Sequence, residues 1–102
     1  MADDRLVLHE KLKDFLGSEN VYFQPPDGFR LSYPCIIYEF SRLDTRKADN
    51  MNYFVNDVYE VTYVDSDPDN DFKKRFLQAF PNSCWGRRYV SSNRYHDSFY
   101  IF

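Results

Sequence analysis

Few residues of this chain are able to do acid, base or nucleophilic chemistry, and they are widely spaced. Its histidines and cysteines are His9, His96, Cys35 and Cys84, and none has another histidine or cysteine at the close spacing of zinc motifs. The three glycines are too far apart to form a phosphate-binding loop. We interpret each cysteine as a small apolar residue on a strand, with a free thiol in a reducing compartment. No catalytic residue, metal site or cofactor is predicted.

Acidic residues are the next candidates for chemistry. Four aspartates alternate along the segment Asp65 to Asp71 and resemble a calcium-binding loop at first inspection. Counted from its first residue, an EF-hand loop requires glycine at the sixth position and glutamate at the twelfth, where this chain has Asn70 and Phe76. A solvated turn with a helix cap fits these residues better. Glu39 and Glu60 fall on neighbouring predicted strands, where paired carboxylates are usually exposed or matched to arginine.

Arginine and aromatic residues interleave between Trp85 and Tyr95, a pattern that on a sheet is able to stack the bases of single-stranded nucleic acid. The chain nevertheless has a formal net charge of −3, from 13 basic and 16 acidic residues. A domain that grips phosphates normally carries a basic excess. We therefore interpret Arg87, Arg88 and Arg94 as partners of acidic residues in the same or a neighbouring subunit, with nucleic-acid binding as the alternative.

The length of the chain, residues 1–102, indicates one small domain, and a domain of this size has a small hydrophobic core. Aromatic residues make up 20% of it, more than such a core requires. Since tyrosine is enriched at protein interfaces, this surplus predicts that other subunits cover part of the surface, although a strand-rich domain also favours aromatic residues. No apolar run is long enough for a membrane span, and the N-terminus lacks the pattern of a signal peptide. We expect a soluble protein made in the cytoplasm.

Two segments have the apolar spacing of an amphipathic helix. The first, Asp3 to Gly17, ends at a glycine suited to a left-handed stop. The second begins after an N-cap at Asp69 or Asn70 and ends before Pro81. Its predicted buried face consists of Phe72, Phe76, Leu77 and Phe80.

Strand signals occupy most of the remaining chain. Asn20 to Gln24 is short and is closed by two prolines, which indicates an edge strand, and the apolar run Tyr33 to Ser41 predicts a buried strand. The stretch from Arg42 to Asn52 is polar and without period, so we predict a loop there. Tyr53 to Asp65 then resumes as a strand, with Tyr59, Val61 and Tyr63 on one side and Val58, Glu60, Thr62 and Val64 on the other.

The C-terminal segments Cys84 to Val90 and Arg94 to Phe102 predict a hairpin around the turn Ser91 to Asn93. The resulting order of elements is α-β-β-β-α-β-β. Helices and strands segregated in this way predict an α+β fold, in which a largely antiparallel β-sheet has two helices packed on one face.

Several tracts of the chain resemble a known family. In order along the sequence they are "NVYFQPP" at Asn20 to Pro26, "YPCIIYE" at Tyr33 to Glu39, "ADN" at Ala48 to Asn50 and "YEVTYVDSDPD" at Tyr59 to Asp69. Together they are similar to small proteins encoded among the head-to-tail joining genes of long-tailed bacteriophages. These are the tail terminators, also called tail completion or neck proteins.

The resemblance implies a structural virion protein, assembled in the host cytoplasm, that forms a ring at the head-proximal end of the tail tube. The ring, typically a hexamer, ends tube polymerisation and joins the tail to the head connector. Its implied partners are other copies of itself, the tail tube protein and the head connector or neck protein, with no membrane. DNA would pass through the acidic ring without specific binding, since like-charged phosphates gain no affinity there. The alternatives are another head-tail joining or head completion protein and a single-strand nucleic-acid-binding domain.

Within that family we expect two regions to form the subunit or tube interface. The predicted loop Leu43 to Met51 is long enough to reach a neighbour, although a mobile surface loop is an equal alternative. The tyrosines of the strand Val58 to Val64 would meet the next subunit, unless they belong to the core. The predicted interface residues are Arg42, Asp44, Arg46, Lys47, Asp49, Tyr38, Tyr59 and Tyr63.

Overall fold

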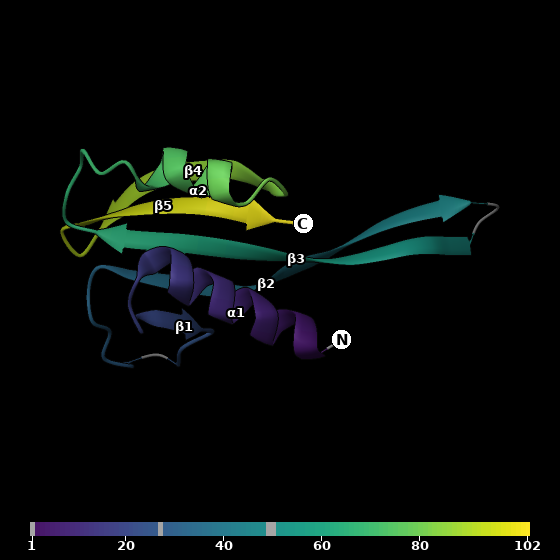
Figure 1. Cartoon of the computed structure of the whole chain (residues 1–102), viewed down its shortest axis with the longest axis horizontal. Helices are drawn as coiled ribbons and strands as arrows, with labels where there is room; N and C mark the ends of the chain where they lie inside the picture. Colours follow the sequence, from purple (N-terminus) through teal and green to yellow (C-terminus); the bar gives the residue numbers. More distant parts are fainter. Residues whose placement is uncertain (1, 27, 49–50) are drawn as a thin grey trace.

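The chain folds into a five-stranded mixed sheet with two helices (Figure 1). The computed structural model describes the backbone of residues 2–26, 28–48 and 51–102 and the side chains of residues 5–26, 28–43 and 57–102. The elements are α1 (Ala2–Leu16), β1 (Val21–Phe23), β2 (Cys35–Ala48), β3 (Met51–Asp65), α2 (Phe72–Ala79), β4 (Ser83–Ser91) and β5 (Arg94–Ile101). Across the sheet the strands lie in the order β1-β2-β3-β5-β4, with β1 parallel to β2 and the other pairs antiparallel. The predicted α+β class and element order are confirmed.

Both helices begin and end close to the predicted residues. After α1, Gly17 has a φ of 73° and its N–H donates to the carbonyl of Lys13 at 2.8 Å, so glycine relieves the strain of the left-handed stop. Before α2, the side-chain oxygen of Asn70 accepts the N–H of Phe72 at 3.1 Å, and the helix ends two residues before Pro81. Glycine thus ends α1, whereas the N-cap position of α2 is Asp71, whose side chain makes no capping hydrogen bond.

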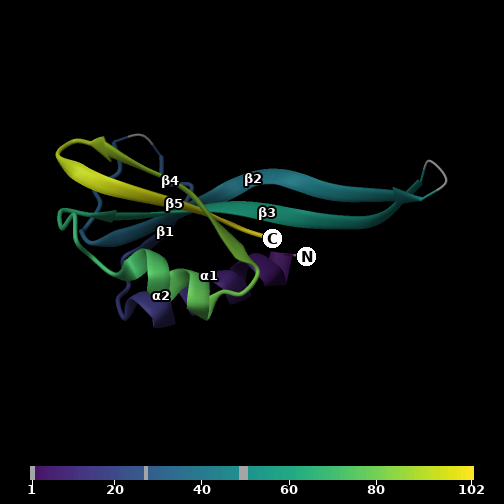
Figure 2. The ribbon, with the colours of Figure 1, turned by 90° about the horizontal axis from the view of Figure 1, so that it is seen from above.

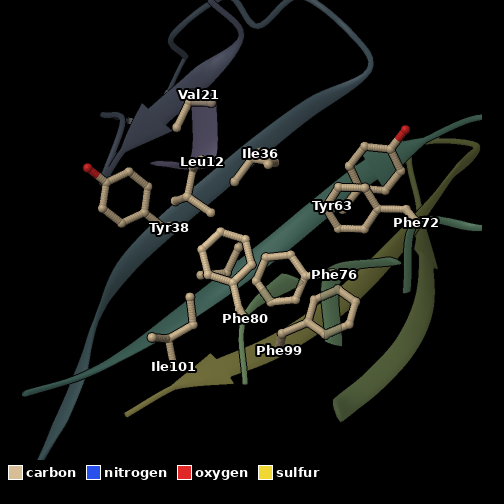
Figure 3. Packing of buried hydrophobic residues seen from close by; sticks show 11 residues of the cluster. Leu12, Val21, Ile36, Tyr38, Tyr63, Phe72, Phe76, Phe80, Phe99 and Ile101 are labelled. Carbon is tan, nitrogen blue, oxygen red and sulfur yellow. The ribbon is translucent and has the colours of Figure 1, made fainter. Parts of the chain in front are cut away.

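Both helices lie against the same face of the sheet (Figure 2), and between them and the strands lies the aromatic core (Figure 3). The ring of Tyr63 stacks on Phe72 with centroids 3.8 Å apart. From α1, Phe15 meets the three phenylalanines of the second helix region edge-on at 5.3 to 5.8 Å. The buried cluster comprises Leu12, Val21, Ile36, Tyr38, Val61, Tyr63, Phe72, Phe76, Phe80, Phe99 and Ile101.

Within the described residues no helix lies on the opposite face of the sheet (Figure 2), and we call it the helix-free face. Side chains alternate between the two faces, so Val61 and Tyr63 enter the core while Glu60 and Thr62 point to the helix-free face. The predicted division of β3 into two sides is therefore confirmed. The helix-free face includes Ile37, Glu39, Glu60, Thr62, Tyr89 and His96.

The C-terminal hairpin turns through Ser92 and Asn93, whose φ angles of 52° and 61° suit a two-residue turn between antiparallel strands. A shift of register between Trp85 and Arg88 places a bulge in β4. Gly86 lies in this bulge, where an added Cβ would come within 2.8 Å of the backbone oxygen of Ser98. Glycine is therefore needed here for close strand approach.

The predicted loop from Arg42 to Asn52 is wrong for its described residues. β2 continues to Ala48 and β3 starts at Met51, and they pair from Arg42 opposite Val58 to Ala48 opposite Met51. This paired segment, which we call the arm, projects beyond the helices and makes the molecule 49 Å long against 25 and 24 Å across (Figures 1 and 2). Backbone pairing requires no side-chain pattern, so the polar sequence from Arg42 to Ala48 is compatible with a strand.

Candidate interaction surfaces

No cluster of metal-binding side chains forms in the described part of the chain. Among residues 5–26, 28–43 and 57–102, no three histidine, cysteine or acidic side chains lie close enough to hold a metal ion. Cys35 is a buried free thiol on β2, and Cys84 is an exposed one on β4. Burial raises the pKa of Cys35 to about 11, so this thiol is neutral near pH 7 and a poor nucleophile.

The alternating aspartates between β3 and α2 shape a turn. One side-chain oxygen of Asp65 accepts the N–H of Ser66 at 2.7 Å, and Asp67 accepts the N–H of Asp69 at 2.9 Å. Aspartates commonly form such local bonds in turns. The interpretation as a turn is confirmed, but the predicted N-cap at Asp69 or Asn70 is wrong, because the N-cap position is Asp71 and its side chain makes no capping hydrogen bond.

The three arginines of the C-terminal hairpin have partners within the chain. Arg88 donates from Nε and Nη2 to the two carboxylate oxygens of Asp97, at 2.7 and 3.1 Å. The guanidinium carbons of Arg87 and Arg94 lie 4.8 and 3.9 Å from the ring centres of Tyr89 and Tyr33. Pairing with an acid is thus confirmed for Arg88, while the other two contact aromatic rings.

The predicted interface tyrosines lie mostly in the core. Tyr38 is fully buried and Tyr63 is 7% exposed, so these rings are not available to a neighbouring subunit, whereas Tyr59 is half-buried. Burial raises the pKa of Tyr38, and its oxygen accepts from Arg5 Nη1 at 3.2 Å. The Tyr38 hydroxyl and Nδ1 of His9 also share a hydrogen bond of 2.7 Å. Burial, followed by Lys13 and Arg5, lowers the pKa of His9.

The remaining predicted interface residues belong to the arm. Arg42, Asp44, Arg46 and Lys47 all lie on β2, opposite residues of β3, rather than in a loop. The guanidinium of Arg42 lies 5.7 Å from the ring centre of Tyr100 at the base of the arm. The side chains of the other three lie outside the described set, and Asp49 lies outside the described residues altogether.

A groove of about 300 Å³ crosses the helix-free face. Glu39 on β2 lies directly opposite Glu60 on β3, as their places in the sequence suggested, and Glu60 accepts the hydroxyl of Ser98 at 2.9 Å. Beside them, Tyr89 stacks on His96 with centroids 4.7 Å apart, and burial raises the pKa of Tyr89. The groove is lined by Gln24, Pro25, Ile37, Glu39, Glu60, Thr62, Tyr89 and His96.

Sequence reasoning missed this groove because it is formed by four strands, β2 to β5, and by Gln24 and Pro25, which follow β1. The pairing of β5 between β3 and β4 brings His96 beside residues far from it in the sequence. The only signal of the groove in the sequence was the alternation of side chains along β2 and β3. That alternation indicated the positions of Glu39 and Glu60 but of no other lining residue.

Apolar side chains also remain exposed near the base of the arm. Leu6 and Val7 on α1 are each 52% exposed, and Leu43 on β2 is 53% exposed. A second hollow of about 250 Å³ lies between α1, β3 and the C-terminal residues. It is lined by Val7, Leu8, Lys11, Asp57, Tyr59, Phe80, Asn82, Ile101 and Phe102.

Comparison with protein-family models, with curated proteins and with solved structures finds no match to this chain. Within the described residues, neither helix has the length and apolar character that crossing a membrane would require. Function must therefore be inferred from the chain's own residues and from its shape.

Proposed function

We propose that this chain is a structural subunit of the neck of a long-tailed bacteriophage, of the tail-terminator type. Copies of it form a ring, typically a hexamer, on the head-proximal end of the tail tube, end tube polymerisation and join the tail to the head connector. Its partners are other copies of the chain, the tail tube protein and the connector or neck protein. DNA passes through the ring without specific binding, and the chain resides in the virion after assembly in the host cytoplasm.

The arm is the observation that carries this proposal. A two-stranded ribbon without a further strand or helix against it is at best marginally stable in water. β2 and β3 nevertheless continue as such a ribbon beyond both helices (Figure 2). A projecting element that lacks cover in its own chain is suited to contact with another molecule.

Two further features support a role in assembly. Leu6, Val7 and Leu43 offer apolar surface where the arm leaves the body. Different surfaces of one chain, such as an arm and a body, make a head-to-tail contact that closes into a ring when its rotation allows. The sequence tracts that resemble tail terminators favour this kind of assembly over other oligomers.

Electron microscopy tests the proposal at two levels. The purified chain is expected to form rings at high concentration, and antibody labelling of the phage particle is expected to mark the junction between tail tube and head. Label within the head connector would instead favour the head-completion alternative. A chain that stays monomeric and binds single-stranded DNA with strongly salt-dependent affinity would contradict the proposal and favour the nucleic-acid-binding alternative.

A further inference from the structure

The arm leaves the backbone of both its strands open on the outer side. β1 pairs with β2 only as far as Phe23 opposite Tyr38. The side chain of Gln24 extends this cover to Phe40, whose N–H donates to it at 3.3 Å. On the other side of the sheet, β5 pairs with β3 only from Tyr59 onward. Within residues 2–26, 28–48 and 51–102, no further strand lies beside the arm, so its two outer edges have backbone N–H and C=O groups without a neighbouring strand.

The outer edges of the body differ from those of the arm in being protected against pairing. β1 has three residues and is followed by two prolines, which have no N–H to donate. β4 is interrupted by its bulge. A short strand, prolines and bulges are the devices by which sheets prevent pairing with other molecules. Any pairing of strands between copies is therefore disfavoured at the body.

The arm has a regular stretch that is long enough to accept another strand. Its ladder contains five consecutive pairs, from Arg42 opposite Val58 to Arg46 opposite Phe54, between two shifts of register. No proline occurs from residue 42 to residue 58. About five residues is the usual length of a strand in globular proteins, so each edge of this stretch offers a full strand to a partner.

The two free edges of the arm also complement each other. β2 and β3 run antiparallel, so a second copy placed alongside brings its β2 edge antiparallel to the β3 edge of the first. Antiparallel strands pair through backbone hydrogen bonds, which require no particular side chains. Adjacent arms do not repel each other through net charge, because residues 42–58 have equal numbers of basic and acidic residues. These are Arg42, Arg46, Lys47, Asp44, Asp49 and Asp57.

We infer that the β2 edge of one arm pairs with the β3 edge of the arm of a second copy, so that an antiparallel sheet continues from subunit to subunit. This contact deepens the proposed ring and rests on it, since it identifies the surfaces that join neighbouring subunits. The two edges are different surfaces, so the contact is heterologous and each subunit offers both halves of it. In a closed ring every strand of the arms has a neighbour on both sides, which stabilises a ribbon that is marginal alone.

Disulfide cross-linking between two sets of single-cysteine variants tests this pairing. Cys84→Ser first removes the exposed thiol, while the buried Cys35 stays in place. The β2 set then covers residues 42–46, from Arg42→Cys to Arg46→Cys, and the β3 set covers residues 54–57, from Phe54→Cys to Asp57→Cys. Opposite Cα atoms of antiparallel strands lie about 4.5–5.5 Å apart, within the range that a disulfide spans.

Each β2 variant is mixed with each β3 variant, oxidised mildly and separated by gel electrophoresis without reducing agent. For the positions that lie opposite each other in the contact, the mixture is expected to give at least about tenfold more cross-linked dimer than either variant alone, because only unlike edges meet. A disulfide between the two introduced cysteines must join two molecules, since each chain carries only one of them.

Matched controls separate pairing from random collision and from misfolding. Glu10→Cys on α1 and Lys74→Cys on α2, also with Cys84→Ser, place exposed thiols away from the arm. Their mixture is expected to give no more cross-linked dimer than either control alone. Under reducing conditions, sedimentation velocity and thermal melting followed by circular dichroism are expected to show that all variants assemble and fold like the Cys84→Ser chain.

The outcomes distinguish the edge pairing from the broader proposal. Rings that give no cross-link between unlike edges at any tested position overturn the pairing and leave the proposed ring intact. Cross-links that are equally abundant within one set also overturn it, because like edges then meet. If the Cys84→Ser chain is monomeric at its highest soluble concentration and no mixture cross-links, the pairing is overturned, and labelling of the phage particle decides the neck function separately.

Discussion

The ion pair between Arg88 and Asp97 gives the sharpest stability prediction. Asp97 is 0% exposed and both of its carboxylate oxygens accept from Arg88. The same guanidinium donates from Nη1 to the carbonyl of Pro68 at 2.7 Å, so it ties the C-terminal hairpin to the connection before α2. The hydrogen bonds to Asp97 are the largest cause of the raised pKa of Arg88, and they outweigh burial, which lowers it.

Removing the two partners is expected to have unequal effects. Arg88→Met leaves a fully buried carboxylate without its cation, a defect that costs about 3–5 kcal/mol. Asp97→Asn keeps one acceptor oxygen for Arg88. The Arg88 side chain is also 27% exposed and keeps its hydrogen bond to the carbonyl of Pro68, so we expect the free energy of unfolding to fall by about 1–3 kcal/mol. A domain of this size has roughly 5–15 kcal/mol of total stability, so Arg88→Met removes a large share.

Urea unfolding measures both effects through the fluorescence of Trp85, the single tryptophan, whose ring lies 5.4 Å from that of Phe99 on β5. The double variant Arg88→Met with Asp97→Asn is expected to lose at least about 1 kcal/mol less than the sum of the single losses, because the two residues interact directly. Arg87→Met, on the exposed neighbour, serves as the control and is expected to lose less than about 1 kcal/mol. The assigned role of this ion pair would be refuted if the stability losses of the two single variants simply added in the double variant. It would also be refuted if Arg87→Met lost as much stability as Arg88→Met.

Three further changes test other parts of the fold. Gly86→Ala forces a Cβ to within 2.8 Å of the Ser98 backbone oxygen. The overpacking is expected to lower the free energy of unfolding, measured in urea, by about 1–3 kcal/mol. An unchanged midpoint of urea unfolding would contradict the close approach of the two strands. Burial raises the pKa of Cys35 from 9.0 to about 11, so the folded state favours the neutral thiol, and stability of up to roughly 3 kcal/mol is lost as the pH rises from 9 to 11. Cys35→Ala should remove this part of the alkaline loss, whereas Cys84→Ala at the exposed thiol should leave the pH profile unchanged. The lowered pKa of His9 means that the unfolded chain binds its proton more readily, so stability present above pH 6.5 is lost as the pH falls below it. His9→Gln should weaken this acid dependence in urea unfolding, and a profile identical to that of the wild type would exclude a contribution from His9.

The sequence was sufficient to predict those helices and strands whose apolar side chains are spaced by burial in the core. The face of α2 that carries Phe72, Phe76 and Phe80 is buried against the sheet, as its spacing predicted. Alternation along β3 also assigned its side chains to the correct faces. Burial of apolar side chains creates these periodicities, so they are readable without knowledge of the neighbouring elements.

The arm and the ion pair depend on contacts that leave no such local pattern. From Arg42 to Ala48 the strand is paired through its backbone, and backbone pairing requires no pattern of side chains. The bulge between Trp85 and Arg88 shifts the register of β4, so the partner of Arg88 is not evident from counting along the hairpin. The candidate groove similarly required the strand order, which places His96 of β5 beside Thr62 and Tyr89.

The free edges of the sheet bear on how copies of this chain associate. The outer strands are β1, which has three residues, and β4, and an unbroken outer strand is able to pair with any similar edge. In β4 the bulge interrupts the ladder, and exposed Arg87 adds a charge to this strand, both of which discourage pairing between sheets. Contact through the arm would instead have a defined direction and one receiving surface. Directional association of this kind favours a closed ring over open aggregation, provided that the rotation between neighbours closes.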